Sequence, residues 1–373
     1  MKIVAVVGTR PEAIKVAPVV HAARRRGVDT VVCATAQHRE MLDQVLTLFD
    51  LEADIDLDLM EPGQTLASLS ARALTALDEA FGAVRPDCIL VQGDTTTAMI
   101  AALAGFYRGI PVGHIEAGLR TGDLARPFPE ELNRRVADTI SAMHFVPTTS
   151  ARENLRTEGF AAHSLHVTGN TVVDALHWVR GLDGDGLAEF ADSLPEPEAR
   201  MVLVTAHRRE SFGEGMREIA SAMRRIAHAH PDVHLVYPVH PNPQVRTVME
   251  AELGGLKRVS LLPPLAYRPF VELMARAELI LSDSGGVQEE APALGVPALV
   301  MRETTERPEA VDAGAVRLVG VRADSIFSAA DELLTNPAAH ARMARAINPY
   351  GDGQAAERIV SILLEEPWEP FAC

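Results

Sequence analysis

Residues 2–26 read KIVAVVGTRPEAIKVAPVVHAARRR, a short apolar strand that passes through one tight turn into an amphipathic helix. The same order recurs along the chain, where TVVCAT precedes REMLDQVLTLF and CILVQGD precedes TTAMIAALAGFYR. Val- and Ile-rich strands that alternate with helices are typical of βαβ units, in which helices bury both faces of a parallel sheet. The pattern therefore predicts a doubly wound α/β fold.

Residues 181–199, GLDGDGLAEFADSLPEPEA, interrupt this pattern because they are rich in Gly, Pro and acids. Strands and helices then alternate again, from MVLVTAH through LILSDSG to PALVM. A chain of 373 residues also exceeds what one hydrophobic core usually organises. We therefore expect two doubly wound Rossmann-like domains, residues 1–170 and 171–355, with ligands bound where the carboxyl ends of the strands face a shared cleft.

Composition limits the classes of function. The 35 Lys and Arg residues against 51 Asp and Glu give a formal net charge of -16, which repels nucleic acid and anionic lipid at long range. Cys33, Cys88 and Cys373 are widely spaced and odd in number, which favours a reducing compartment and argues against structural zinc. No apolar run approaches the roughly twenty residues of a membrane span, and the first one is too short for a signal peptide. We expect a cytoplasmic protein.

The first candidate site is the turn at residues 8–15, GTRPEAIK. Thr9 and Glu12 have the spacing of a capping box, so the turn has a well-formed helix start. Arg10 and Lys15 place two cations beside the positive end of that helix, where they favour a bound anion. The alternative is a helix cap without a ligand. Two cations at the positive end of a helix repel it unless an anion binds, which favours the anion site. The absence of GxGxxG after the first strand and of GxxxxGK[ST] argues against a dinucleotide oxidoreductase and an NTPase.

The second candidate site is residues 282–290, SDSGGVQEE, which follow an apolar strand. Ser284 can cap the next helix, and Gly285 and Gly286 allow a pyrophosphate to approach the exposed amides. Glu290 lies one helical turn beyond Gly286 on the same face, where an ionised carboxylate can accept ribose hydroxyls. Paired glycines also occur in ordinary turns. Together with Glu290 they predict a site for a nucleotide diphosphate and, opposite a second domain, for a nucleotide sugar.

Four more polar residues follow predicted strands: Asp94, Glu116, Glu130 and His207. Asp94 could simply cap the next helix, and Glu130 or its neighbour Glu131 could be a first-turn acid favoured by the helix dipole. Glu116 places a charged side chain directly after a buried strand. Proteins retain such an unfavourable position mainly at functional sites.

Ten motifs carry a resemblance to a known family. They occur in this order across nearly the whole chain: GTRPEAIK, QHREML, QGDTTTA, GHIEAGLR, PFPEELNRR, TGNTVVD, HRRE, YPVHPNP, SDSGGVQEE and ERPE. They resemble the non-hydrolysing UDP-N-acetylglucosamine 2-epimerases. The resemblance implies a two-domain fold of the GT-B type with its active site in the interdomain cleft, a homodimer, and a tail at residues 356–373 that returns to the first domain.

The resemblance also implies a reaction. UDP-N-acetylglucosamine would be reversibly epimerised at C2 by elimination of UDP to 2-acetamidoglucal and re-addition, without cofactor or metal, to supply mannosamine for cell-surface polysaccharide. Three carboxylates in one cleft do not all ionise freely, so one should have a raised pKa and act as the acid. The implied catalytic residues are Asp94, Glu116, Glu130 and His207, and the implied residues for UDP and the UDP-sugar are Arg10, Lys15, Phe270, Ser284, Gly285, Gly286, Glu290 and Arg307.

Two departures from the family pattern concern ligand contacts. Some bacterial relatives are activated by a second UDP-sugar beside a Gln-His-Arg segment, for which Gln37 and His38 are the candidates here. Gly63 replaces an arginine expected beside that site, and Leu265 stands where relatives often carry a polar residue. The alternatives left open are a hydrolysing epimerase, an epimerase of a related sugar such as a UDP-diacetamido uronic acid, a glycosyltransferase, and a binding protein without catalysis.

Overall fold

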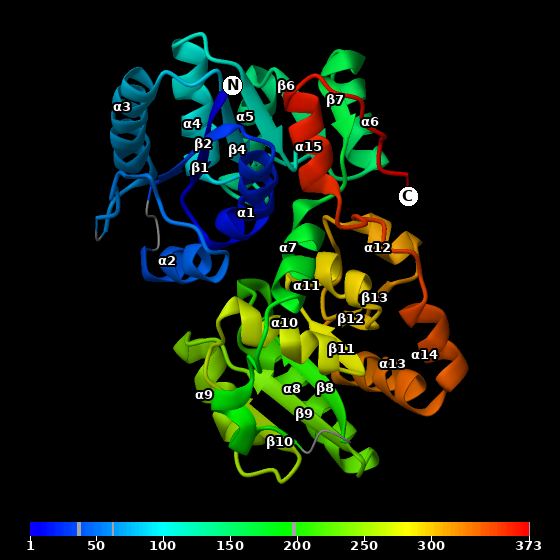
Figure 1. Cartoon of the computed structure of the whole chain (residues 1–373). Helices are drawn as coiled ribbons and strands as arrows, with labels where there is room; N and C mark the ends of the chain where they lie inside the picture. The colour runs from blue at the N-terminus through cyan, green and yellow to red at the C-terminus, as the bar shows by residue number, and fades with distance from the viewer. Residues whose placement is uncertain (36–38, 62, 196–198, 373) are drawn as a thin grey trace. The chain divides into compact units, whose positions relative to one another are not determined.

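The chain forms two compact units in the computed structural model (Figure 1). The first comprises Met1–Val179 together with Tyr350–Cys373, and the second comprises Arg180–Pro349. The domain limits expected at residues 170 and 355 stay a prediction. The structure describes residues 1–35, 39–61, 63–195 and 199–372.

The first unit is built on a parallel sheet with the strand order β3-β2-β1-β4-β5-β6-β7. Helix α4 packs between α3 and α5, and α1 packs between α2 and α15. The strands are β1 (Lys2–Val7), β2 (Asp29–Ala34), β3 (Ile55–Asp56), β4 (Cys88–Gln92), β5 (Val112–Ile115), β6 (Met143–Val146) and β7 (Leu165–Val167). The helices are α1 (Arg10–Arg25), α2 (Arg39–Leu48), α3 (Leu66–Val84), α4 (Thr96–Tyr107), α5 (Glu130–Ile140), α6 (Thr149–Thr157), η1 (Ala162–Ser164), α7 (Thr171–Arg180) and α15 (Ala355–Leu363).

The second unit has a parallel sheet with the strand order β10-β9-β8-β11-β12-β13. Helix α8 packs against both α9 and α13. The strands are β8 (Arg200–Thr205), β9 (Val233–Pro238), β10 (Val259–Leu262), β11 (Leu279–Ser282), β12 (Ala298–Val300) and β13 (Val316–Leu318). The helices are η2 (Ala188–Ser193), η3 (Arg209–Ser211), α8 (Glu214–Ala229), α9 (Pro243–Leu253), α10 (Tyr267–Arg276), α11 (Gly285–Glu290), η4 (Pro292–Leu294), α12 (Pro308–Asp312), α13 (Ala323–Thr335) and α14 (Pro337–Ala344).

Each sheet reverses its strand order at one point. In the first sheet β1 pairs with both β2 and β4, and in the second β8 pairs with both β9 and β11. Connections leave toward opposite sides at such a switch point, which opens a crevice outside the carboxyl ends of the strands. The predicted α/β class with two doubly wound sheets is confirmed. The residues that follow the strands at each switch point are therefore the expected ligand-binding residues.

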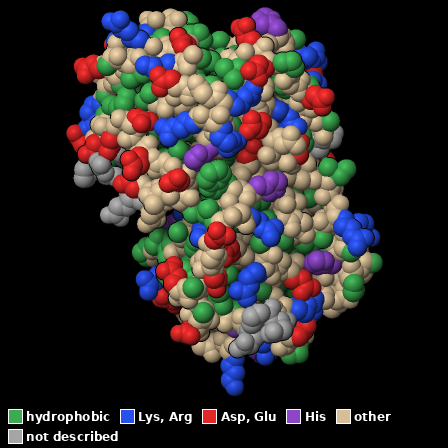
Figure 2. Space-filling view, viewed as in Figure 1, with side chains coloured by type: hydrophobic (Ala, Val, Ile, Leu, Met, Phe, Trp, Pro, Cys, Tyr) green, Lys and Arg blue, Asp and Glu red, His purple; other side chains and the backbone are tan. Residues whose placement is uncertain are grey.

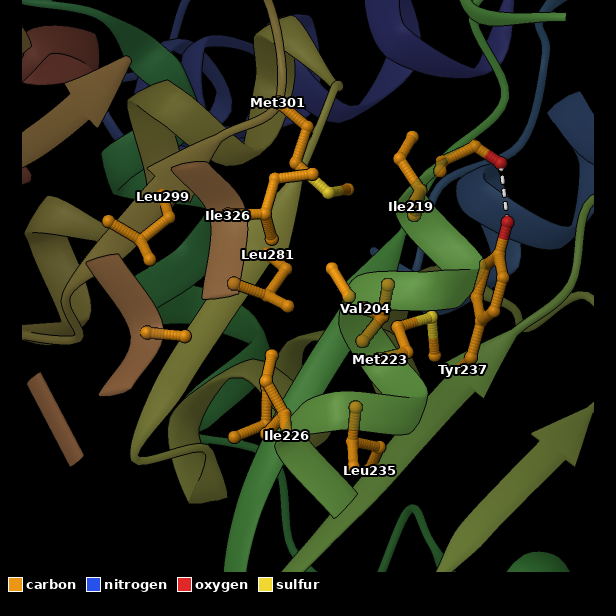
Figure 3. Packing of buried hydrophobic residues seen from close by; sticks show 14 of the residues in the cluster. Val204, Ile219, Met223, Ile226, Leu235, Tyr237, Leu281, Leu299, Met301 and Ile326 are labelled. Atoms are coloured by element: carbon orange, nitrogen blue, oxygen red, sulfur yellow. Dashed lines mark hydrogen bonds between the residues drawn. The ribbon is translucent and has the colours of Figure 1, made fainter. Parts of the chain in front are cut away.

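The core of the second unit lies between its sheet and α8 and α13 (Figure 3). Val204, Leu235 and Leu281 reach it from three neighbouring strands, and Ile226 and Ile326 from the two helices. All five side chains are fully buried. Strands covered by helices need this continuous apolar face, which explains the unbroken apolar runs in the sequence.

Tyr237 is the polar member of this core, and Figure 3 shows its hydroxyl bonded to a backbone oxygen. The hydroxyl donates to the Ala206 carbonyl at 2.6 Å, and the side chain is fully buried. Burial raises the pKa of Tyr237, so the phenol stays a donor. This bond fixes the backbone directly before His207.

Acidic and basic side chains are interspersed over the face of the molecule seen in Figure 2. The excess of acids therefore does not gather into one large patch on this face. None of the helices in the described parts of the chain is both long and apolar enough to cross a membrane.

Candidate active site

The turn after β1 has the predicted helix start. Glu12 accepts the N–H groups of Gly8 and Thr9 at 3.0 and 2.7 Å, and the hydroxyl of Thr9 at 2.8 Å. Its other oxygen accepts the Thr95 hydroxyl at 2.5 Å, which ties this turn to the turn after β4. Burial raises the pKa of Glu12, although these hydrogen bonds oppose the rise. Glu12 is thus a structural acid beneath the two turns of the switch point.

Lys15 and Glu116 form an ion pair at this edge of the sheet. Lys15 lies on α1, whose first residue is the half-buried Arg10. Glu116 follows β5 directly and has φ 67°, a left-handed conformation that is uncommon for a residue other than glycine. Gln92, the last residue of β4, donates to the same Glu116 oxygen at 3.0 Å. The predicted cation and the predicted proton-transfer acid are therefore in direct contact.

Asp94 does not cap helix α4, so the simpler alternative for this residue was wrong. Thr95 is the cap, and its hydroxyl oxygen accepts the Ala98 N–H at 3.0 Å. The carboxylate of Asp94 instead pairs with Arg134, whose Nε lies 3.1 Å from Oδ2. Asn133 donates to the Asp94 carbonyl at 2.9 Å. Two consecutive residues of α5 thus hold Asp94 from both its side chain and its backbone.

Glu130 and Glu131 begin α5 but have different surroundings. Glu131 is fully buried and accepts the N–H groups of Thr121 and Gly122, at 3.1 and 3.3 Å, besides pairing with Arg134. Glu131 is therefore the structural acid of the two. The Oε2 of Glu130 is buried and has no hydrogen-bond partner among the residues that the structure describes. A buried oxygen in that state is costly unless a ligand or a proton satisfies it.

A buried histidine supports the turn that carries Asp94. His114, in β5, bonds through Nδ1 to Asp138 at 2.6 Å and through Nε2 to the Gly93 carbonyl at 2.7 Å. Burial disfavours the charged imidazole, but Asp138 outweighs it and raises the pKa of His114. Both ring nitrogens face acceptors, as suits an imidazolium. This pair was not predicted from the sequence, although a histidine inside the apolar run VGHI indicates a buried polar partner.

His207 follows β8 at the switch point of the second sheet. Its backbone N–H and that of Arg208 donate to Asp283 at 2.7 and 2.8 Å. Asp283 is fully buried and follows β11, so it joins the two strand ends. The ring of His207 stacks on His240 with 5.4 Å between centroids, and its Nδ1 lies 3.3 Å from Asp283 Oδ1. His240 thus lies directly beside His207.

The glycine pair begins α11 as predicted. Ser284 is the N-terminal cap residue, but its hydroxyl makes no capping bond within the described structure. Gly286 is exposed, and a Cβ there would lie 3.9 Å from Glu290 Oε2, so Glu290 is on the expected face. Tyr267 donates to the other oxygen of Glu290 at 2.7 Å. Phe270 is half-buried on the same helix as Tyr267.

Arg307 lies over the start of α11. Its Nη1 is 2.7 Å from the point where a Cβ of Gly285 would be, so a side chain at that position would displace it. Arg307 donates to Glu289 at 2.5 Å and to Glu306 at 2.6 Å. Burial alone would raise the pKa of Glu306, but Arg307 and then Arg302 lower it to about 2. The arginine is thus held beside the glycine pair by two acids.

The structure brings Lys15, Asp94 and Glu116 to one strand edge of the first unit, with Glu130 at the start of the helix that holds Asp94. His207, Ser284 and Gly285 follow the two central strands of the second unit. Gln37 and His38 lie outside the described residues. No cluster of three or more His, Cys, Asp or Glu suited to a metal ion occurs in the described ranges. The catalytic and binding roles of these residues stay predictions.

Comparison with known proteins gives one consistent family. A family model described as UDP-N-acetylglucosamine 2-epimerase matches residues 21–364. The chain is 53% identical over 369 residues to proteins of that name from Yersinia pestis and Escherichia coli K12, covering 97% of this chain and 98% of each relative.

Solved structures agree with this result. The UDP-GlcNAc 2-epimerase of Neisseria meningitidis bound to UDP-GlcNAc superposes with a TM-score of 0.91 at 46% identity, covering 98% of this chain and 100% of that one. The enzyme of Methanocaldococcus jannaschii in complex with UDP-GlcNAc and UDP gives a TM-score of 0.82 at 32% identity, covering 98% and 100%. The resemblance to UDP-N-acetylglucosamine 2-epimerases drawn from the ten motifs is confirmed, and the non-hydrolysing type stays a prediction.

Proposed function

Because this chain belongs to the UDP-N-acetylglucosamine 2-epimerase family, we propose that it interconverts UDP-N-acetylglucosamine and UDP-N-acetylmannosamine without net hydrolysis. The observation that carries this proposal is the pairing of Lys15 with Glu116 at the switch point of the first sheet. The Lys15 ammonium group can stabilise the negative charge of a departing diphosphate, and the Glu116 carboxylate can accept the proton from the sugar. The two groups are in direct contact.

The proposed reaction removes the proton from C2 and breaks the bond between C1 and the diphosphate oxygen. UDP leaves with the bonding electrons, and 2-acetamidoglucal remains. Re-addition of UDP at C1 and return of a proton to the other face of C2 give the epimer. Carboxylates on both faces of the sugar are needed for these transfers. Asp94, Glu116 and Glu130 are the proposed groups.

Glu130 is suited to exchange a proton with a bound sugar. Its buried Oε2 makes no hydrogen bond to any described residue, so it is available to a substrate hydroxyl or to the transferred proton. Asp94 and Glu116 each contact a cation, Arg134 and Lys15. The three carboxylates thus differ in their partners, as an assignment of separate acid and base roles requires.

The diphosphate needs positive groups that become more favourable as its charge develops. In the first unit these are Lys15 and Arg10 at the start of α1. In the second unit we assign Ser284, Gly286 and Arg307 to the phosphates, and Glu290 to the ribose. His207 would neutralise the departing UDP.

Incubation with UDP-N-acetylglucosamine in deuterated water tests the proposal, with C2 followed by proton NMR. We expect deuterium at C2 of both UDP-linked epimers. Release of UDP and free N-acetylmannosamine would instead establish the hydrolysing alternative. Binding of UDP without exchange would favour a related UDP-2-acetamido sugar as the substrate.

Three wider expectations stay predictions. They are a homodimer, action in the cytoplasm, and the supply of mannosamine units to a cell-surface polysaccharide. Activation by a second UDP-sugar at Gln37 and His38 is likewise a prediction from the sequence.

A further inference from the structure

Residues 168–174, TGNTVVD, form a motif to which the proposed reaction gives no role. The motif follows β7 and enters α7, the helix at whose end the chain leaves the first unit. Gly169 has φ 87°, in the left-handed region that favours glycine. The turn at Gly169 brings the motif against the returning segment, residues 350–356, where the chain re-enters the first unit.

Asn170 bonds to the first residue of the returning segment. Its N–H donates to the Tyr350 carbonyl at 2.6 Å. A Cβ at Gly351 would lie 3.4 Å from the Asn170 carbonyl oxygen and 3.3 Å from Val173, so the two stretches of chain are in close contact. A displacement of the returning segment would therefore reach Asn170 directly.

Asp174 fixes the same segment at a second point. Its carboxylate accepts the N–H groups of Ala355 and Ala356, at 3.2 and 2.9 Å, at the start of α15. A carboxyl group at a helix N-terminus satisfies donors that otherwise have no intrahelical partner. The motif thus holds the returning segment at two points: at Asn170, directly before α7, and at Asp174, in the first turn of α7.

The side chain of Asn170 points to the candidate site. It is 3% exposed, and its Oδ1 accepts the Val172 N–H at 3.0 Å. This bond identifies the oxygen end of the amide, so the nitrogen end faces Glu116 Oε2, 3.4 Å away. The same carboxylate oxygen receives Gln92 and pairs with Lys15. Donors from β4, from α1 and from the motif therefore converge on Glu116.

We propose that Asn170 is a positioning residue that holds Glu116 for proton transfer and joins it to the returning segment at Tyr350. The proposal rests on the proposed function, since Asn170 acts through Glu116. Lys15 is drawn toward the diphosphate when UDP leaves, whereas Asn170 and Gln92 carry no charge and remain on the carboxylate. A donor to an ionised carboxylate favours that form, so Asn170 also keeps Glu116 ready to accept a proton.

Two variants separate the contact with Glu116 from the local fold. Asn170→Ser retains an oxygen that can accept the Val172 N–H but is too short to reach Glu116. Asn170→Asp retains the shape and the accepting oxygen, and places a repelling oxygen opposite Glu116. Asn336→Asp is the matched control. Asn336 Oδ1 likewise accepts backbone N–H groups, at the start of α14, but Asn336 belongs to the second unit, whereas Glu116 belongs to the first.

We expect kcat for epimerisation to fall roughly tenfold to a hundredfold in both Asn170 variants, as for a lost hydrogen bond to a charged group. KM and the affinity for UDP should stay the same. The acidic limb of the pH dependence of kcat should move to higher pH, most in Asn170→Asp. The control should keep the kinetics of the unmodified protein.

Unchanged kcat and unchanged acidic limb in a folded Asn170→Ser protein would overturn the proposal, as would a rise in KM alone. Circular dichroism reports the fold, and the serine variant decides if the aspartate variant does not fold. Lack of C2 exchange in the unmodified protein would overturn the proposed function itself. Failure of the positioning role alone leaves that exchange intact, so the two failures are distinguishable.

Discussion

Glu116 combines a strained backbone with a crowded carboxylate. A non-glycine residue in the left-handed region costs on the order of 1–3 kcal/mol. Its φ of 67° is held by a side chain that contacts Lys15, Gln92 and Asn170. The backbone directs this carboxylate out of the strand, toward the donors of three other elements, so the left-handed conformation sets the direction of the proposed proton-transfer group.

Replacement of this carboxylate should separate chemistry from binding. We expect Glu116→Gln to abolish deuterium exchange at C2, because an amide cannot take the proton, while UDP still binds. Proton NMR and calorimetry measure the two effects. Glu153→Gln is the control, since Glu153 is partly exposed on α6 and pairs with Arg156. Exchange at the normal rate in Glu116→Gln would remove Glu116 from proton transfer.

Tyr237 shows how the core supports the second candidate site. Tyr237→Phe would leave the Ala206 carbonyl without its buried donor. We expect the free energy of unfolding to fall by about 1–3 kcal/mol, measured by urea denaturation. Tyr107→Phe serves as the control because Tyr107 is 66% exposed. Equal stability of both variants would mean that water or a backbone shift replaces the Tyr237 bond.

Helix α5 shows what the sequence predicts at the scale of an element. The sequence left open which of Glu130 and Glu131 is only a first-turn acid favoured by the helix dipole, because spacing does not distinguish adjacent residues. The resemblance alone assigned catalysis to Glu130. The N–H groups of Thr121 and Gly122, which donate to the fully buried Glu131, make Glu131 the structural one. Those partners lie in the irregular loop before α5, and hydrophobic periodicity does not predict the conformation of such a loop.

Local and long-range features differ in the same way across the molecule. The alternation of strands and helices, the turn with Glu12 and the face shared by Gly286 and Glu290 depend on neighbours in sequence, and they were predicted. The contact of His114 with Asp138 spans 24 positions and that of Asn170 with Glu116 spans 54. Such pairs arise from the packing of elements that are far apart in sequence, so no local pattern predicted them.

The link between α7 and α15 should depend on pH through Asp174. Burial raises the pKa of Asp174 from 3.8 to about 7, although the N–H groups of Ala356 and Ala355 oppose the rise, and Asp352 adds to it. Arg358 on α15 also faces this carboxylate. Between these two values the folded chain holds a proton that the unfolded chain has lost. The stability that this proton contributes is therefore present below the lower value and lost as pH rises to about 7.

Asp174→Asn removes that dependence because an amide does not ionise. We expect the free energy of unfolding of the variant, relative to the unmodified protein, to increase as pH rises through this window. Urea denaturation at about pH 5 and about pH 8 measures it. Asp324→Asn, at a position whose side chain is 89% exposed, should show no such trend. A constant difference between variant and unmodified protein at both pH values would contradict the expectation.

At the scale of the whole molecule, the two units differ in continuity. The second unit is one stretch of chain, whereas the first is completed by residues 350–373. The completing helix α15 packs on α1, and its Ile359 and Val360 are fully buried. Arg25 and Arg26 at the end of α1 pair with Glu357 and Glu366, so ion pairs add to the apolar contact between α1 and the completing segment.

Removal of residues 350–373 should therefore affect the units unequally. We expect hydrogen exchange, followed by mass spectrometry, to show lost protection in β1–β7 and retained protection in β8–β13. Ile359→Ala is a milder test and should lower stability by about 2–5 kcal/mol through the cavity that it leaves. Full protection of the first sheet in the truncated chain would mean that α15 is dispensable for that unit.

The late position of α15 also matters while the protein is being made. The ribosome must synthesise all 170 residues of the second unit between the two parts of the first. At about 5–20 residues per second this takes roughly 10 to 30 seconds. During that time the side of α1 that α15 will cover is open on the nascent chain. The first unit therefore waits for its last helix with that side uncovered, and slow codons after residue 349 would lengthen the wait.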